Sequence, residues 1–389
     1  MTERVYLDHA ATTAVHPAAV EAMLREYQRL GNPSSLHHTG RAARRVVEES
    51  REEIAAVLGA HPTELIFTSG GTEADNLAIK GGYWAARRAD PDRAAVAVAA
   101  IEHHAVLEAA EWLATDQGAE LTPIGVDADG RVDPDTVVPA GERTGVVSVG
   151  WANNEVGTIQ RIAEIAERAH RAGALAHSDA VQAVGQLPVD FAASGLDLMT
   201  VTGHKLGGPV GVGALVARRD APLTPVLHGG GQERDVRSGT LDVPAIAGFA
   251  AAVRATAADR AEHAAGLREL RDRLVGGVQQ LPGVRPNGPT APDQVLPGLV
   301  SLSFAGCDAD AVVLLLDQAG IDCSAGAACS AGVTEPSHVL LAMGRTPAEA
   351  RSAVRFSFGR STTPADLDRL LAALPEAVER ARTAGSLAG

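Results

Sequence analysis

The sequence of 389 residues is poor in cysteine and in aromatic residues, and it contains no long apolar run. Its three cysteines, Cys307, Cys323 and Cys329, are an odd number and too few for a disulfide framework, which predicts a protein of the reduced cytoplasm. No stretch approaches the roughly 18 uninterrupted apolar residues that a membrane helix needs. The first residues include an early acid and no apolar signal-peptide core, so we expect neither membrane insertion nor export.

The chain also lacks an excess of positive charge. Its net charge is −14, and no basic run is longer than the pairs at 44–45 and 87–88. A nucleic-acid groove needs clustered cations, so the composition argues against this class of partner. The mean hydropathy is near zero and 46% of the residues are hydrophobic, which predicts a globular protein with a filled interior. A chain of this length is expected to form two domains.

Up to about residue 255, strand-like and helical segments alternate. The expected strands are 65–68, 94–101, 144–150, 174–177, 198–201 and 212–217, and the helices near them include 40–58, 72–80 and 106–114. These β segments are apolar throughout, which is typical of a parallel sheet covered on both faces. We therefore predict an α/β fold with a mostly parallel sheet.

The pattern changes toward the C-terminus. A long helix is expected over 244–280, followed by a linker rich in proline and glycine at 281–297. Two later helices begin with clear signals, Thr-Pro-Ala-Glu at 346–349 and Thr-Pro-Ala-Asp at 363–366. The expected domains are a large one of residues 15–255 and a smaller α+β one built from 1–14 and 256–389.

One stretch combines an apolar strand, a lysine and a glycine-rich turn: Leu-Met-Thr-Val-Thr-Gly-His-Lys-Leu-Gly-Gly at 198–208. Lys205 follows the strand directly, and the glycines let the backbone approach a ligand closely. A lysine in a dry pocket has a lowered pKa and can form a Schiff base with an aldehyde. By itself, the stretch fits a surface lysine in a tight turn better than a reactive one.

Polar clusters follow the other expected strands, at the edge of a parallel sheet where ligands bind. The segment 69–75 places a glycine pair before a helix, which suits a phosphate or an ordinary turn, but matches neither a dinucleotide fingerprint nor a P-loop. The next three strands are followed by Glu102-His103-His104, by Asn153-Asn154-Glu155 and by Ser178-Asp179. A buried aspartate needs a partner, and a protonated ring nitrogen would be one. Each cluster alone fits a structural polar group, whereas the series favours one ligand pocket.

Eleven short motifs lead to a more specific prediction. They are Tyr-Leu-Asp-His-Ala-Ala-Thr-Thr at 6–13, Gly-Asn-Pro-Ser-Ser at 31–35, Phe-Thr-Ser-Gly-Gly-Thr-Glu at 67–73, Glu-His-His-Ala-Val at 102–106, Asn-Asn-Glu-Val-Gly-Thr-Ile-Gln at 153–160, His-Ser-Asp-Ala-Val-Gln-Ala-Val-Gly at 177–185, Gly-His-Lys at 203–205, Gly-Gly-Gly-Gln-Glu-Arg at 229–234, Arg-Ser-Gly-Thr at 237–240, Gly-Ala-Ala-Cys-Ser at 326–330 and Arg-Phe-Ser-Phe-Gly-Arg at 355–360. In this order they closely resemble the cysteine desulfurases of the NifS/IscS type. Those are pyridoxal 5'-phosphate (PLP) enzymes of the class V aminotransferase group with the fold-type I architecture.

The resemblance implies a role for each polar strand end. Lys205 would carry PLP and move the proton at the substrate Cα, and Asp179 would pair with the pyridinium nitrogen. Gln182 and Asn154 would bind the phenolic oxygen of the cofactor. His103 would stack on the ring face.

It also implies sites for the phosphate and the substrate. The phosphate would be held by Gly71, Thr72, Thr202 and His204. Thr240 would reach the phosphate of the other subunit, so a homodimer is implied. Arg355, whose fork matches a carboxylate, would clamp the carboxylate of L-cysteine together with Asn32.

Cys329 would be the sulfur acceptor, since its thiolate can attack the substrate sulfur and leave L-alanine and an enzyme persulfide. It lies in a stretch of small residues at 323–332, whereas Cys307 and Cys323 are expected to be buried. The implied partner is a sulfur-acceptor protein, either an iron–sulfur scaffold or a thiolation enzyme, and no metal site is implied. Three alternatives stay open: a selenocysteine lyase, another class V aminotransferase, and a non-catalytic scaffold with the same fold.

Overall fold

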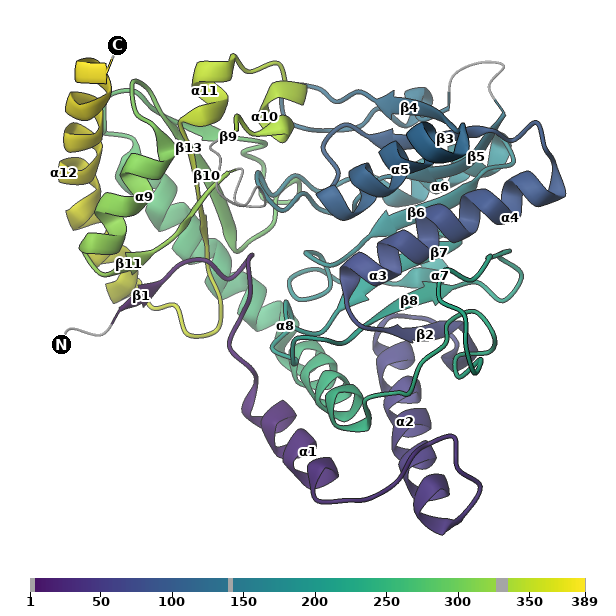
Figure 1. Ribbon diagram of the computed structural model, residues 1–389. Helices are drawn as coiled ribbons and strands as arrows, with labels where there is room; N and C mark the ends of the chain where they lie inside the picture. The colour runs from purple at the N-terminus through teal and green to yellow at the C-terminus, as the bar shows by residue number, and fades with distance from the viewer. Residues whose placement is uncertain (1–3, 139–142, 327–334, 389) are drawn as a thin grey trace.

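The computed structural model describes residues 4–138, 143–326 and 335–388, and it confirms the α/β architecture (Figure 1). A seven-stranded sheet with its helices forms the larger part of the molecule. A four-stranded sheet with its own helices forms the smaller part, on the left of Figure 1. Among the described residues, none of the helices has both the length and the apolar character to cross a membrane.

The large sheet has the strand order β2-β8-β7-β6-β5-β3-β4 and is parallel except at β8, which is antiparallel to both of its neighbours. Its strands are β2 (Leu65–Thr68), β3 (Ala95–Ala99), β4 (Glu120–Ile124), β5 (Thr144–Ser148), β6 (Leu175–Asp179), β7 (Leu198–Thr202) and β8 (Gly213–Ala217). Six of them match the expected strands. The edge strand β4 was not predicted, because its partly exposed sequence includes Pro123 and lacks the apolar run of the others.

Helices cover both faces of this sheet (Figure 1). The helical segments of the larger part are α1 (Pro17–Tyr27), α2 (His38–Val57), η1 (Pro62–Glu64), α3 (Gly71–Asn76), η2 (Leu77–Gly81), α4 (Gly82–Ala89), α5 (His104–Gln117), η3 (Pro134–Thr136), α6 (Ile162–Arg171) and α7 (Phe191–Ser194). The helix expected over 72–80 continues through a π-helical turn to Ala89. Gly81 has a helical φ of −65° and continues it. A glycine is needed there because a Cβ would lie 2.6 Å from the Thr224 carbonyl oxygen.

The smaller part contains the antiparallel sheet β12-β13-β10-β9 and the parallel pair β1-β11. Its strands are β1 (Val5–Tyr6), β9 (Val284–Asn287), β10 (Leu299–Phe304), β11 (Ile321–Asp322), β12 (Ser324–Ala325) and β13 (Ala353–Ser357). Its helices are α9 (Ala309–Gln318), α10 (His338–Ala342), α11 (Pro347–Arg351) and α12 (Pro364–Ala388). Strand β9 falls within the expected linker at 281–297, and the Asn287 amide is buried against the hydroxyl groups of Ser301 and Ser303.

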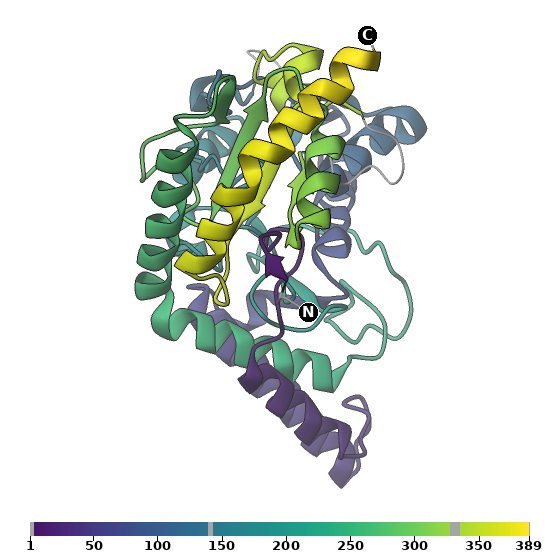
Figure 2. The same ribbon diagram turned by 90° about the vertical axis from the view of Figure 1, so that its left-hand side faces the viewer.

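The long helix α8 (Val243–Val278) connects the two parts (Figure 2). Its N-terminal half packs Val243, Ile246 and Phe249 into the core of the large sheet. Its C-terminal half packs Leu267 and Leu274 into the core of the smaller sheet. Because both cores share this helix, the edge of the large sheet where β3, β5, β6 and β7 end lies beside the smaller sheet.

Candidate active site

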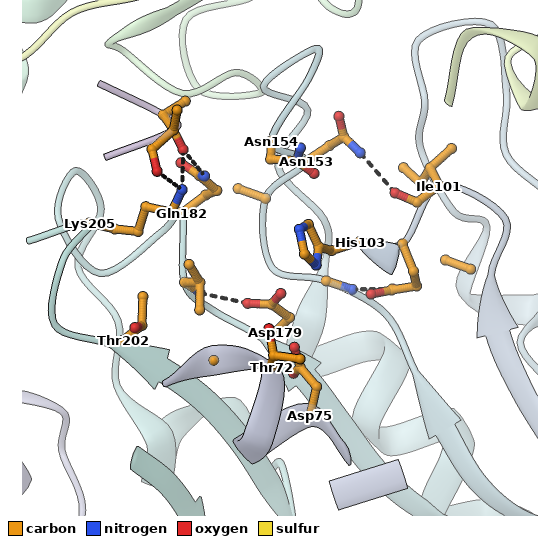
Figure 3. A pocket seen from close by; sticks show the side chains of 18 of the residues that line it. Thr72, Asp75, Ile101, His103, Asn153, Asn154, Asp179, Gln182, Thr202 and Lys205 are labelled. Atoms are coloured by element: carbon orange, nitrogen blue, oxygen red, sulfur yellow. Dashed lines mark hydrogen bonds between the residues drawn. The ribbon is translucent and has the colours of Figure 1, made fainter. Parts of the chain in front are cut away.

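A cavity of about 310 Å³ lies where β3, β5, β6 and β7 end. The N-terminal segment closes it with Ala10 and Ala11, and the smaller part adds Gly326 and Arg355. Ten of the predicted site residues line it: Gly71, Thr72, His103, Asn154, Asp179, Gln182, Thr202, His204, Lys205 and Arg355. Figure 3 shows the cavity and labels several of them, among them Lys205 and Asp179. The fold therefore gathers residues that lie as far apart as 71 and 355 in the sequence around one cavity.

Lys205 follows β7 and reaches across the cavity to the N-terminal segment. Its Nζ donates hydrogen bonds to the carbonyl oxygens of Ala10 and of Ala11, the latter over 2.6 Å. Gln182 Nε2 donates to the same Ala10 carbonyl over 3.0 Å (Figure 3). The turn after the lysine requires Gly207, whose φ is +80°, a conformation that other residues rarely adopt. The amino group of Lys205 is thus held at the wall of the cavity.

Asp179 is the last residue of β6, and its carboxyl group faces the cavity (Figure 3). Its Oδ1 accepts the backbone N–H of Val181 over 2.8 Å. Burial raises the pKa of Asp179, and the Val181 hydrogen bond and the charge of Lys205 oppose that rise. A carboxylate desolvated in this way is stabilised by a nearby cation, and a protonated ring nitrogen would be such a cation.

Two further acids line the cavity, and the sequence analysis assigned no role to either. Asp75 is 1% exposed and its Oδ1 accepts no hydrogen bond from the described residues, the Nε2 of His177 lying 3.7 Å away. Glu102 is 3% exposed and accepts the Gly150 N–H over 2.5 Å; burial and the charge of Asp179 raise its pKa to about 8. A helical spacing of three from Thr72 was the available signal for Asp75.

His103 stands at the start of α5, where its Nδ1 accepts the N–H of Ala105 over 3.2 Å. This cap fixes the direction of the ring, which enters the cavity in Figure 3. Burial lowers the pKa of His103, and the charge of Lys205 lowers it further, so the ring is neutral at pH 7. A neutral, oriented ring suits stacking on a flat ligand.

At the end of the cavity next to α3, the backbone is free of bulky side chains. Gly70 caps the helix, and a Cβ at Gly71 would lie 3.2 Å from the side chain of Val181. Thr72 and Thr202 add hydroxyl groups, and the helical segment that starts at Gly71 presents N–H groups there. Burial and the charge of Lys205 lower the pKa of His204 to about 4. N–H groups, hydroxyls and a neutral imidazole together suit a phosphate.

Arg355, on β13, is 4% exposed and enters the cavity from the smaller part. Its Nη2 donates to Asp8 Oδ1 over 2.9 Å, and its Nη1 donates to the Asn154 carbonyl over 2.9 Å. Its Nε has no hydrogen-bond partner among the described residues. The sequence could not reveal the ion pair with Asp8, which joins residues 347 positions apart.

Two of the predicted site residues that the structure describes do not line the cavity. Asn32 is exposed in a turn where its Oδ1 accepts the Ser34 N–H, and Thr240 is exposed beside a separate small cavity. Cys329 lies outside the described residues. Cys307 is buried, as expected, and Cys323 is half-buried, with a pKa that burial and the nearby acid Asp8 raise to about 12.

The lining residues fit PLP, the cofactor implied by the motifs. They offer an amino group at Lys205, a carboxyl group at Asp179, an aromatic ring at His103 and an anion-binding end at Thr72 and Thr202. Each of these groups has a counterpart on the cofactor: the aldehyde, the ring nitrogen, the ring face and the phosphate. The pocket therefore has a donor set suited to each part of PLP.

Comparison with known proteins agrees with this chemistry. The model of the family "aminotransferase class-V" matches residues 5–370. The IscS-like cysteine desulfurase of Mycobacterium tuberculosis is 53% identical over 383 residues, which cover 97% of this chain and 97% of that protein. The cysteine desulfurase of Cereibacter sphaeroides is 44% identical over 384 residues, which cover 98% of this chain and 97% of that protein.

Solved structures lead to the same family. A NifS-like protein from Rickettsia africae superposes with a TM-score of 0.86 at 32% identity, and the match covers 97% of this chain and 100% of that one. A second NifS-like protein gives a TM-score of 0.88 at 34% identity, covering 97% and 100% of the two chains. These matches confirm the resemblance seen in the motifs. The chain belongs to the class-V aminotransferase family, among its cysteine desulfurases of the NifS/IscS type.

Proposed function

We propose that this enzyme removes sulfur from L-cysteine with PLP as its cofactor, leaving L-alanine and a persulfide on Cys329. The cysteine desulfurase family implies this cofactor. The observation that carries the proposal is that Lys205, Asp179 and Arg355 open on a single cavity. A lysine, an acid and a carboxylate-binding arginine in one pocket are what an enzyme of amino-acid chemistry with PLP needs. PLP supplies the electron sink that makes the substrate Cα–H acidic.

The residues of the chain would divide the remaining work. Lys205 would hold the cofactor through its amino group and move the proton at Cα, since it stands at the cavity wall. Asp179 would favour the protonated ring nitrogen, and His103 would cover the ring. Gln182 and Asn154, which both line the cavity, would contact the phenolic oxygen.

Arg355 would bind the substrate carboxylate. Its Nη1 and Nη2 are oriented by one hydrogen bond each, to the Asn154 carbonyl and to Asp8, so each of these nitrogens has a second N–H group that can donate to a ligand. Guanidinium groups bind carboxylates through parallel N–H donors. A rigidly held arginine at the wall contributed by the smaller part fixes the orientation of the substrate Cα toward Lys205.

Cys329 would accept the sulfur. Its thiolate forms the S–S bond as the substrate C–S bond breaks, and a proton delivered to carbon completes L-alanine. The persulfide then passes to a sulfur-acceptor protein, for which an iron–sulfur scaffold and a thiolation enzyme are both chemically suitable.

The enzyme would act as a homodimer in which Thr240 serves the partner's cavity. Thr240 is exposed and lies outside the cavity of its own chain. Large apolar side chains are also exposed on α1 and the segment after it: Leu24 at 56%, Tyr27 at 63%, Leu30 at 89% and Leu36 at 89%. Apolar groups at this density on one projecting segment favour burial against a second copy.

The first experiment tests Lys205. The sequence contains one other lysine, Lys80, whose Nζ lies 4.5 Å from the ring centroid of Trp112. Borohydride fixation of bound PLP followed by peptide mapping should label Lys205 alone, and Lys205→Arg should abolish the label while Lys80→Arg keeps it. Label on Lys80 would refute the assignment.

The second experiment separates sulfur transfer from cofactor binding. Cys329→Ser should bind PLP, with its visible absorption responding to L-cysteine, but form neither alanine nor persulfide. Cys323→Ser is the matched control and should retain activity. Equal losses in both variants, or full activity in Cys329→Ser, would show that the sulfur acceptor is another residue.

A further inference from the structure

Glu155 is a buried acid that the functional assignment above does not use. It is 5% exposed and lies in the connection after β5, one residue beyond the Asn154 that lines the cavity. Asn153 fixes this turn, because its Oδ1 accepts the N–H groups of Glu155 and Val156, both over 2.9 Å. The Asn153 amide in turn donates to the Ile101 carbonyl over 2.9 Å. The backbone that carries Glu155 is therefore rigid.

The Glu155 carboxyl group contacts two residues that are distant from it in the sequence and belong to the smaller part. The hydroxyl group of Ser337 donates to its Oε2 over 2.5 Å, and Ser337 is fully buried. A Cβ built on Gly326 would lie 3.3 Å from the same Oε2, so the glycine backbone packs directly against the carboxyl group. Gly326 and Ser337 lie on either side of Cys329 in the sequence, at distances of three and eight residues.

The same turn also orients the arginine of the cavity. Arg355 Nη1 donates to the carbonyl of Asn154, the residue next to Glu155. Arg355 lies on β13, which pairs with β12 at Ser324, two residues before Gly326. The turn at 153–155 thus makes two hydrogen bonds to the smaller part. The backbone carbonyl of Asn154 accepts from Arg355, and the side chain of Glu155 accepts from Ser337.

The carboxyl group makes these contacts without a salt bridge among the described residues. Burial raises the pKa of Glu155 to about 7, while the Ser337 hydrogen bond and the charge of Arg355 oppose that rise. Burying a carboxyl group lowers the free energy of unfolding unless hydrogen bonds and packing compensate. The contacts that Glu155 makes here are with Gly326 and Ser337.

We propose that Glu155 is a positioning residue for sulfur transfer, whose carboxyl group holds Gly326 and Ser337 in register with Arg355. The proposal rests on the role given above to Cys329. Glu155 touches neither substrate nor cofactor; it acts by fixing the two points from which the chain leads to the cysteine. Loosening either point lowers the fraction of time in which the thiol and the substrate sulfur are within reach of each other.

The test compares the rate of persulfide formation in single turnovers of the holoenzyme. Ser337→Ala removes the hydroxyl that bonds Glu155, and we expect a roughly tenfold slower persulfide step with KM for L-cysteine unchanged within about twofold. Thr346→Ala is the matched control. Ser337 also caps the short helix α10, where its Oγ accepts the Leu340 N–H. Thr346 caps a short helix of the same part, α11, in the same way, and its loss should leave the persulfide step unchanged.

A second pair of variants isolates the carboxyl group. Glu155→Gln keeps an oxygen that can accept from Ser337 and should stay within about threefold of the wild type, whereas Glu155→Ala should be as slow as Ser337→Ala. Alkylation of the holoenzyme supplies a readout apart from turnover: in the slow variants Cys329 should react at a changed rate while Cys323 stays unreactive.

Three outcomes would overturn the proposal: an unchanged persulfide rate in Glu155→Ala, an equal loss in Thr346→Ala, or simultaneous exposure of Cys323, which would indicate general loosening. Failure of the assigned sulfur acceptor is a separate result. It would appear in the wild type as a persulfide on a residue other than Cys329, whatever the variants do.

Discussion

Two buried arginines of this chain differ in how many of their N–H groups are hydrogen-bonded within the fold. Arg51, on α2, is 7% exposed, and all three of its guanidinium nitrogens donate hydrogen bonds. Its Nη1 and Nη2 hold the buried carboxylate of Glu233 over 2.8 and 2.7 Å, Nη1 also bonds the Leu65 carbonyl, and Nε bonds Glu48. Every donor nitrogen of this side chain is engaged with the protein itself.

Arg355 is equally buried, at 4% exposed, but its bonding is incomplete. One nitrogen bonds Asp8, one bonds the Asn154 carbonyl, and Nε has no hydrogen-bond partner among the described residues. It also lines the cavity, which Arg51 does not. A guanidinium that is held in place by two hydrogen bonds has N–H groups left for a ligand, whereas Arg51 has four of its five N–H groups engaged within the fold. The difference supports the proposed use of Arg355 in substrate binding and a structural use of Arg51.

The largest effect should come from breaking the buried ion pair between Arg51 and Glu233. Arg51→Met leaves the Glu233 carboxylate buried, with the Phe67 N–H as a remaining donor, so we expect a loss of about 3–5 kcal/mol in the free energy of unfolding. Urea unfolding of the holoenzyme measures it. The double variant Arg51→Met/Glu233→Leu should recover a large share, because no unpaired charge then remains buried. A loss below about 1 kcal/mol in the single variant would mean that the pair does not hold the fold.

The next effect concerns catalysis rather than stability. Arg355→Lys replaces a planar fork with a single ammonium, and we expect kcat/KM for L-cysteine to fall about 100-fold, which corresponds to roughly 2.7 kcal/mol. Arg285→Lys is the control, since Arg285 lies on β9 and forms an exposed ion pair with Glu349. Steady-state kinetics on L-cysteine would contradict the comparison if both variants lost activity equally.

The sequence was sufficient for features that depend on local pattern. The strand before Lys205, the polar residues after each strand and the helix start at Thr346 all follow from neighbouring residues, and the structure confirms them. The two arginine pairs could not be predicted, because Arg51 and Glu233 are 182 positions apart and Asp8 and Arg355 are 347 apart. Strand β9 was hidden by its proline, Pro286, and its place depends on pairing with β10.

Glu102 is a buried carboxyl group that, unlike Glu233, forms no ion pair with an arginine among the described residues. Burial raises its pKa from 4.5 to about 8, so the folded protein keeps a proton that the unfolded chain loses above pH 4.5. The contribution of the Glu102 proton to the free energy of unfolding is therefore complete below pH 4.5. It is lost as the pH rises to 8, at about 1.4 kcal/mol per pH unit.

Glu102→Gln keeps the acceptor for the Gly150 N–H and cannot ionise. Between pH 6 and pH 7 we expect the variant to gain about 1 kcal/mol of unfolding free energy relative to the wild type. Urea titrations at the two pH values measure the difference, and Glu120→Gln, at an exposed position of β4, should show none. Parallel pH profiles for Glu102→Gln and the wild type would mean that Glu102 is ionised in the folded protein.

The smallest effect separates the two functions of Asp8, which orients Arg355 and also neutralises part of its charge. Asp8→Asn keeps an oxygen that can accept from Nη2, so the guanidinium stays in place while the field it exerts on the substrate carboxylate grows. We expect KM for L-cysteine to fall about threefold with kcat nearly unchanged. Asp8→Ala removes the acceptor as well, and its KM should rise because the arginine is no longer held. If both variants raised KM alike, the charge of Asp8 would matter more than the position it gives to Arg355. Arg355 would then resemble Arg51 in needing a charged partner within the fold.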